Sequence, residues 1–316
     1  MAASRSSKMC VRNHTCDRCG HHATLPVSTL VAAVRNKRIQ FWGDSVQAQM
    51  ECDLRVALNS VAQPVLLACN LMECGAHYPS LNASSQYFWV GCPHQASCSV
   101  SNQTIVEMMH HSLVKRAQTA THIVFNIGSH YESYSGPVMS RSLGHFHRVL
   151  SHVGASVIVR SQSDTHFPTA DGMLLSEART NIPNTEPSAG GFCVPHRPRL
   201  TLHFTEVEIR RLAGILHAPF LDVLALSDYP NAHPSPTLTA NRYSDDLQLP
   251  LYHTDCRHFC QNCGIYRAWN SQLVSALIVE PNAMHTSAAA GPLLWGPPLK
   301  PVRGNFTRQT ATMRHT

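Results

Sequence analysis

Short apolar runs alternate with amphipathic stretches along most of the chain, the pattern of strands alternating with helices. The runs predict strands at Arg38–Trp42, Val65–Ala68, 121–127, Ser156–Arg160 and Phe220–Leu226, the last as an inner strand. The amphipathic stretches predict helices at Val27–Val34, Val46–Ala62, Ile105–Gln118, Val138–Val153, Leu202–Leu216 and Trp269–Val279. Such alternation predicts an α/β fold, with a mainly parallel central sheet between helices on both faces.

We expect the chain to divide into three parts. Residues 1–27 form a cysteine-bearing arm, 28–280 a catalytic domain, and 281–316 a tail of small residues and prolines that we expect to be disordered. Residues 69–103 are expected to be rich in loops, with Tyr87, Phe88 and Trp89 as a strand packed on the sheet. The long loop 161–200 is expected to form one wall of the active-site cleft, because long loops in compact domains are commonly functional. A second long loop, 228–254, leads the chain to Asp255.

Composition argues against some functions. With 25 Lys and Arg, 19 Asp and Glu, and no basic block, the chain has only a small positive charge, which disfavours nucleic acid as a partner. A low charged fraction of 14% favours a polar, uncharged surface that suits a neutral ligand such as a sugar. No apolar run is long enough to span a bilayer, and the first residues are no signal peptide.

Twelve cysteines are a large number for a chain of 316 residues. An even number spread over loops predicts disulfides and an oxidising compartment. Asn-x-Ser/Thr glycosylation sequons agree with a secretory route; they lie at Asn13, Asn82, Asn102 and Asn305. For a luminal protein we would expect a missing N-terminal anchor or leader, and a cytoplasmic protein with reduced thiols stays open. So does zinc, at Cys16-x-x-Cys19 and Cys260-x-x-Cys263 with His21 and His22.

The sequence Gly43-Asp44-Ser45 lies where a predicted strand turns into a predicted helix. A serine at such a corner directs its hydroxyl off the edge of the sheet, beside helical N–H groups that lack partners and can hold an oxyanion. A serine before a helix is more commonly only an N-cap. The motif alone therefore makes Ser45 a candidate nucleophile and no more.

A second segment far downstream strengthens this interpretation. Asp255 and His258 are three residues apart, so the carboxylate can orient the imidazole that would take a proton from Ser45. An early serine followed by a late Asp-x-x-His is the order found in SGNH (GDSL-like) hydrolases. The alternative is a surface turn flanked by disulfide cysteines.

Polar residues next to the strands complete the predicted site. Asn126, through its amide, and Gly128, through its N–H, follow a buried strand and are candidate oxyanion donors beside the Ser45 N–H, because α/β folds bind ligands at the carboxyl edge of the sheet. Candidates for the substrate cleft are Asp44, His130, Arg160, His166 and His233. His130 is more commonly a packing residue than a catalyst.

Several segments taken together resemble one family, the plant trichome-birefringence-like proteins of the PC-esterase group. The resembling segments are Arg38–Ser45, Val124–Tyr131, Val159–Ser161, Thr165–Phe167, Gly190–Cys193, Ala232–Ser235, Asp255–Cys260 and Trp269–Asn270, in collinear order over about residues 28–280. The chain departs from the family pattern at Ser129, which is an extra residue, and at Asp228–Asn231, which replace basic residues. It also has a shorter cysteine-rich N-terminal region and no membrane anchor.

The resemblance implies an SGNH-like three-layer sandwich and transfer of acetyl groups onto cell-wall polysaccharides in the Golgi lumen. It makes Ser45 the nucleophile, His258 the base and Asp255 the orienting carboxylate. It implies a disulfide between Cys193 and Cys256 and one from Cys260 to the N-terminal arm. The acetyl donor would be a co-substrate, with no bound cofactor or metal. An acetyl esterase with the same triad and an inactive sugar-binding module remain alternatives.

Overall fold

The computed structural model describes residues 25–67, 73–90, 112–127, 136–163, 193, 204–227, 237–243, 250–253, 258–260 and 263–279. Its centre is a seven-stranded sheet in the order β2-β3-β4-β1-β5-β6-β7. The strands are β1 (Arg38–Gly43), β2 (Val65–Leu66), β3 (Glu73–Tyr78), β4 (Ala83–Trp89), β5 (His122–Phe125), β6 (Ser156–Arg160) and β7 (Phe220–Leu221).

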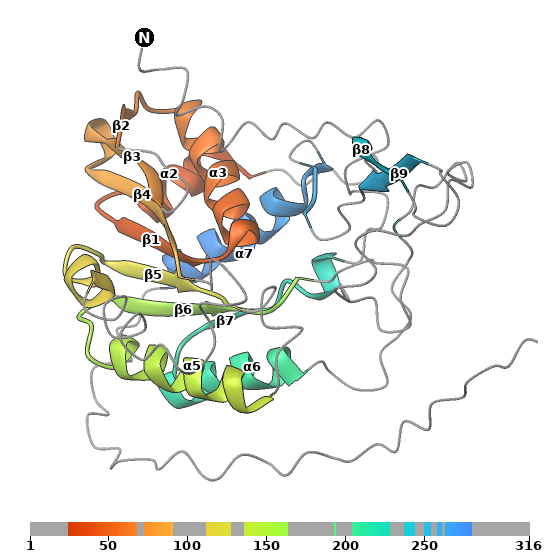
Figure 1. The fold of residues 1–316 in the computed structure, drawn as a ribbon. Coiled ribbons are helices and arrows are strands. Elements are labelled where there is room, and N and C mark those ends of the chain that lie inside the picture. Colours follow the sequence, from red (N-terminus) through yellow and green to blue (C-terminus); the bar gives the residue numbers. More distant parts are fainter. Residues whose placement is uncertain are drawn as a thin grey trace, which may run out of the picture.

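Most of this sheet is parallel. β4, β1, β5, β6 and β7 pair in parallel, and only β2 and β3 pair antiparallel to their neighbours. After β1 the chain crosses to β4 on one side and then returns to β5 on the other, so β1 and β5 meet where the strand order reverses (Figure 1). The carboxyl ends of two such strands are where doubly wound sheets form a crevice for ligands.

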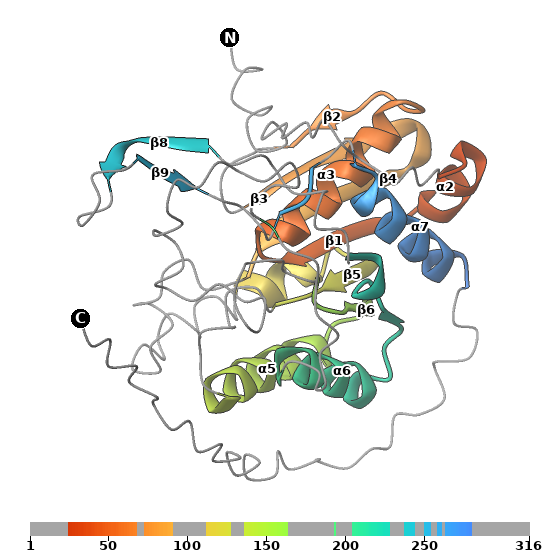
Figure 2. The same ribbon diagram turned by 90° about the vertical axis from the view of Figure 1, so that its right-hand side faces the viewer.

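Helices cover both faces of the sheet. One layer holds α2 (Val27–Val34), α3 (Ser45–Asn59) and α7 (Ile265–Ile278); the other holds α5 (Gly136–Leu150) and α6 (Phe204–Leu216). In Figure 1 and in Figure 2, α5 and α6 lie together below β6, apart from α2, α3 and α7. The described elements thus form a mixed α/β fold compatible with the predicted three-layer sandwich.

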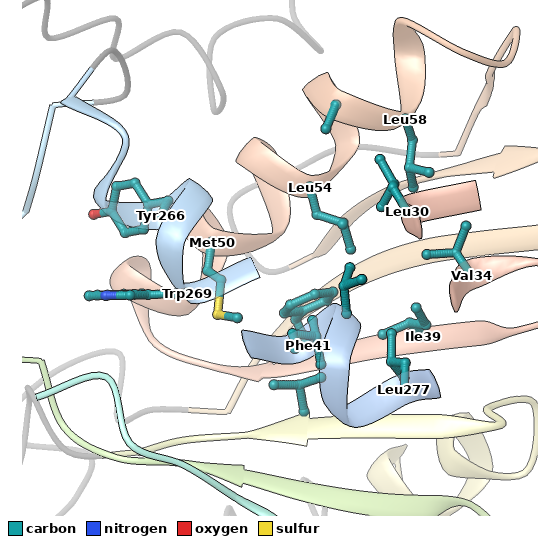
Figure 3. Close-up of a cluster of buried hydrophobic side chains, with 14 of the residues drawn as sticks. Leu30, Val34, Ile39, Phe41, Met50, Leu54, Leu58, Tyr266, Trp269 and Leu277 are labelled. Atoms are coloured by element: carbon teal, nitrogen blue, oxygen red, sulfur yellow. The ribbon is translucent and has the colours of Figure 1, made fainter. Parts of the chain in front are cut away.

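Strand alternation builds a separate core on each face. Ile39 and Phe41 of β1 enter the cluster shared with α2, α3 and α7, whereas Trp42 enters the cluster shared with α5 and α6. Successive side chains on a strand point to opposite faces, so one strand supplies both cores. Figure 3 shows the first cluster, in which Leu54 of α3 points toward Phe41 and Leu277 of α7 lies beside Ile39. The strand that leads to Ser45 is therefore buried on both sides.

Periodicity predicted most helices and inner strands closely. The helix predicted at Val27–Val34 is α2 with the same bounds, and the strand predicted at Ser156–Arg160 is β6. Residues 112–117 are helical, in agreement with the carboxyl half of the helix predicted at Ile105–Gln118. The helix that closes the domain begins at Ile265, before the predicted Trp269, because Gly264 takes the left-handed conformation immediately ahead of it.

Predictions that depended on strand partners were less accurate. Residues 69–103 were expected to be mainly loop, but β3 and β4 form an antiparallel pair there; the aromatic trio does lie on β4. β7 was expected to be an inner strand and is instead a short edge strand. The loop expected at 228–254 contains a two-stranded antiparallel sheet, β8 (Thr237–Tyr243) with β9 (Pro250–His253). The predicted arm up to residue 24, the tail from residue 281 and most of the 161–200 loop lie outside the described residues.

Candidate active site

The nucleophile candidate lies at the carboxyl end of β1, on the first residue of α3. Gly43 makes this turn possible, because a Cβ at this position would lie 2.6 Å from both the Asn126 carbonyl oxygen and the Gln47 Cβ. Real Cβ atoms do not approach backbone atoms so closely, so a side chain at position 43 would push β1 away from the end of β5. The glycine thus lets the chain turn tightly enough to place Ser45 at the point between β1 and β5 where the strand order reverses.

Asp44 caps the helix that begins with Ser45. Its carboxylate Oδ1 accepts the N–H of Val46 at 3.0 Å and of Gln47 at 3.4 Å, and its carbonyl accepts the N–H of Ala48 at 3.0 Å. Among the described residues these bonds account for the second, third and fourth N–H groups of α3. The first, that of Ser45 itself, is the group nearest the reacting oxygen and is oriented by the same helix start.

His258 contacts the candidate nucleophile directly. Its Nε2 lies 2.6 Å from Ser45 Oγ, a hydrogen bond that joins positions 213 residues apart. Both residues are only partly buried, so a ligand can reach them. The contact predicted between an early serine and a late histidine is therefore present. Nδ1, on the opposite edge of the ring, is the atom that an orienting carboxylate would bind; Asp255, predicted for that role, lies outside the described residues.

Arg160 does not line a cleft, as the sequence suggested, but lies fully buried behind the Ser45 turn. Its Nε donates to Gln47 Oε1 at 2.7 Å, its Nη1 donates to the Ser161 carbonyl at 2.9 Å, and its guanidinium lies 5.1 Å from the Trp269 ring centre. Burial lowers the pKa of Arg160 to about 10, while the Asp44, Tyr266 and Glu206 charges act in the opposite direction. The Arg160 guanidinium therefore remains a cation at neutral pH, and its hydrogen bond to Gln47 stabilises the first turn of α3 from the buried side.

Asn126 is also placed differently from the prediction. Its Nδ2 donates to the Arg160 carbonyl at 2.9 Å and the Ser161 carbonyl at 3.1 Å. An amide nitrogen has two hydrogens, so both are engaged by the backbone after β6. The side chain ties the ends of β5 and β6 together in this arrangement and has no hydrogen left for an oxyanion. Asp44, predicted for the cleft, is likewise buried and engaged by the helix start.

A clamp of polar side chains holds α3 against α7. Asp53 of α3 accepts from Arg267 Nε at 3.0 Å, from Arg267 Nη2 at 3.2 Å and from Asn270 Nδ2 at 2.9 Å. Asn270 also donates to the Met50 carbonyl at 3.0 Å. These residues were not predicted individually, although Trp269-Asn270 had been singled out by resemblance. The clamp fixes the helix that begins with Ser45 against the helix that follows His258.

The remaining predicted site residues lie outside the described part of the chain. These are Gly128, His130, His166, His233 and Cys256. Cys193 and Cys260 are disulfide-bonded, as are the other cysteines that the structure describes, Cys52, Cys74 and Cys263. A cysteine in a disulfide has no thiolate to offer a metal, so the pair Cys260 and Cys263 does not support the zinc alternative.

The described residues contain no group of three or more His, Cys, Asp or Glu side chains placed to bind a metal ion. In the same part of the chain, none of the helices has the length and apolarity needed to span a membrane.

Comparison with known proteins adds nothing to this geometry. No protein-family model matches the chain, and a search of curated proteins finds no significant match. The contact between Ser45 and His258 is therefore the observation on which a functional proposal must rest.

Proposed function

We propose that this protein is an SGNH-type acyl-transfer enzyme that moves an acetyl group onto polysaccharide hydroxyls through an acetyl-Ser45 intermediate. The observation that carries the proposal is the 2.6 Å contact of Ser45 Oγ with His258 Nε2 at the amino end of α3. A hydroxyl in contact with an imidazole, beside a helical N–H that can hold negative charge, has the parts that nucleophilic catalysis needs. The position of Ser45 at the carboxyl end of β1, where the strand order reverses, supports the SGNH assignment.

The first half of the reaction forms the acyl-enzyme. Ser45 Oγ attacks the acetyl carbonyl carbon of the donor while His258 Nε2 takes the hydroxyl proton. The Ser45 N–H donates to the resulting oxyanion, and the Gly128 N–H is proposed as its second donor. When the bond between the acetyl carbon and the donor breaks, His258 gives this proton to the leaving group of the donor. Acetyl-Ser45 remains.

The second half transfers the acetyl group to the acceptor. His258 Nε2 takes the proton of an incoming sugar hydroxyl, whose oxygen attacks the acetyl carbonyl, and returns that proton to Ser45 Oγ as the serine leaves. Asp255 would orient the imidazole throughout. The choice of polysaccharide as acceptor rests on the family resemblance. The disulfide-bonded cysteines favour an oxidising, secretory compartment such as the Golgi lumen.

Replacing the nucleophile tests the proposal. We expect Ser45→Ala to lower kcat at least about 10³-fold with an unchanged circular dichroism spectrum, because the covalent step is lost. Ser60→Ala is the matched control, since Ser60 lies at the other end of α3 and its hydroxyl donates to the Ala57 carbonyl at 2.7 Å. A serine-directed phosphonate should label the wild-type protein at position 45. Full activity of Ser45→Ala, or no labelling of the wild type, would refute the proposal and favour a sugar-binding module.

A second assay separates acetyl transfer from hydrolysis. The protein is given p-nitrophenyl acetate with and without a xylan-type oligosaccharide, and the acetylated sugar is measured by mass spectrometry. A transferase produces acetylated oligosaccharide, whereas an esterase releases acetate at the same rate in both reactions. The outcome depends on how well the acceptor excludes water from acetyl-Ser45.

A further inference from the structure

We propose that Tyr266 is a positioning residue that holds His258 in contact with Ser45, an inference that rests on the proposed function. Tyr266 lies in the first turn of α7 and is almost completely buried. Figure 3 shows its ring beside α3, with the hydroxyl pointing away from the aliphatic side chains of the cluster. A buried tyrosine hydroxyl needs polar partners, so the groups that it binds show what it holds together.

The hydroxyl joins two segments that are far apart in the sequence. It accepts the backbone N–H of Phe259 at 3.1 Å and donates to Gln49 Oε1 in a short hydrogen bond. Phe259 directly follows His258, and Gln49 lies one helical turn after Ser45. One oxygen atom thus connects the backbone beside the base to the helix that begins with the nucleophile.

The backbone at residues 258–260 has no regular secondary structure to hold it. The supports of this segment include the hydrogen bond to Tyr266, the packing of the Phe259 ring and the disulfide of Cys260. That ring lies edge-on to Tyr266 at 6.0 Å and to Trp269 at 5.8 Å. Ring packing fixes the depth of the segment, but the hydrogen bond fixes its direction, because a hydrogen bond weakens steeply away from a linear geometry.

The contact between α3 and α7 does not depend on this hydroxyl. Asp53 with Arg267 and Asn270 already clamps the two helices. Removing the Tyr266 hydroxyl should therefore leave the helix pair in place and free the Phe259 N–H and the Gln49 amide oxygen. A small displacement of the base, of the order of 1 Å, can lower the rate of a reaction about 10²-fold.

Tyr266→Phe tests the inference with the ring retained. We expect kcat, and the maximal rate of phosphonate labelling at Ser45, to fall roughly ten- to hundredfold. KM and the inhibitor concentration at half-maximal rate should stay within about twofold, because the ligand contacts are unchanged. A residue that only stabilised the fold would lower the melting temperature without changing the labelling rate of the folded protein.

Tyr78→Phe is the matched control. Tyr78 is equally buried, and its hydroxyl binds Asn59 Oδ1 at 3.0 Å near the opposite end of α3. It should lose stability comparably and keep the wild-type labelling rate. Gln49→Leu removes the acceptor of the same hydrogen bond on a partly exposed residue, and serves if Tyr266→Phe does not fold. The double variant with Tyr266→Phe should label no more slowly than Tyr266→Phe alone, because both changes remove one connection.

The outcomes separate this inference from the proposed function. Suppose that the wild-type protein is labelled at Ser45 and that Tyr266→Phe and Gln49→Leu are labelled as fast as the wild type. Tyr266 then does not position the base, and the proposed function stands. Failure of the wild-type protein to be labelled would overturn both. Slower labelling of both variants, with normal labelling of Tyr78→Phe, supports the positioning role.

Discussion

Removing the carboxylate of Asp53 should weaken the contact of α3 with α7 and cost a measurable part of the free energy of unfolding. Asp53→Ala leaves the fully buried Asn270 amide with only the Met50 carbonyl, so one of its N–H donors loses its partner, at a cost of about 1–3 kcal/mol. The pair with Arg267 adds only about 1 kcal/mol, because that guanidinium is 26% exposed and can be hydrated instead. The expected loss is about 2–4 kcal/mol.

Urea denaturation at pH 7, followed by circular dichroism, measures this loss. Asp222→Ala is the control, since Asp222 pairs with Arg210 at 2.7 Å through a carboxylate that is 52% exposed. The control should lose less than about 1 kcal/mol, as exposed ion pairs do. A loss for Asp53→Ala no larger than that of the control would refute the reasoning that burial of Asn270 makes this carboxylate important.

Two other predictions concern two further buried polar side chains, Asn126 and Glu51. Asn126→Ala should lower the free energy of unfolding by roughly 2 kcal/mol, because the Arg160 carbonyl loses the Asn126 donor and the Ser161 carbonyl keeps only Arg160 Nη1 of the two donors described; unchanged stability with a large fall in kcat would instead show that Asn126 serves the oxyanion. Burial raises the pKa of the Glu51 carboxyl, and the Arg55 charge opposes this shift. The folded protein therefore holds the carboxyl proton more tightly than the unfolded chain does, and the stability that this proton provides is lost as pH rises through the raised pKa. Melting curves should therefore show Glu51→Gln gaining stability relative to wild type as pH rises above the ordinary glutamate pKa of about 4.3, and no pH dependence of the difference would contradict the assignment.

Patterns that act within one element were readable along the chain. The period of apolar residues located α2 and β6 within their observed bounds, because a helix or buried strand is specified by side chains a few positions apart. The pairing of Ser45 with His258 was predicted from residue types and their order, because a serine nucleophile needs a base whatever fold brings it. Resemblance singled out the Trp269-Asn270 pair before its contacts were known.

Contacts between distant elements were decided only by the tertiary structure. β3 became a strand because β4 offered it an antiparallel partner, and a short run without clear alternation does not reveal its partner. Arg160 and Asn126 lie at the ends of β6 and β5, at the edge where ligands bind, yet the first turn of α3 engages the Arg160 guanidinium and the end of β6 engages the Asn126 amide. Tyr266 shows the same limit. The residues next to it in the sequence do not predict its contact with Gln49, and its proposed role depends on α3 and the segment after His258 lying side by side.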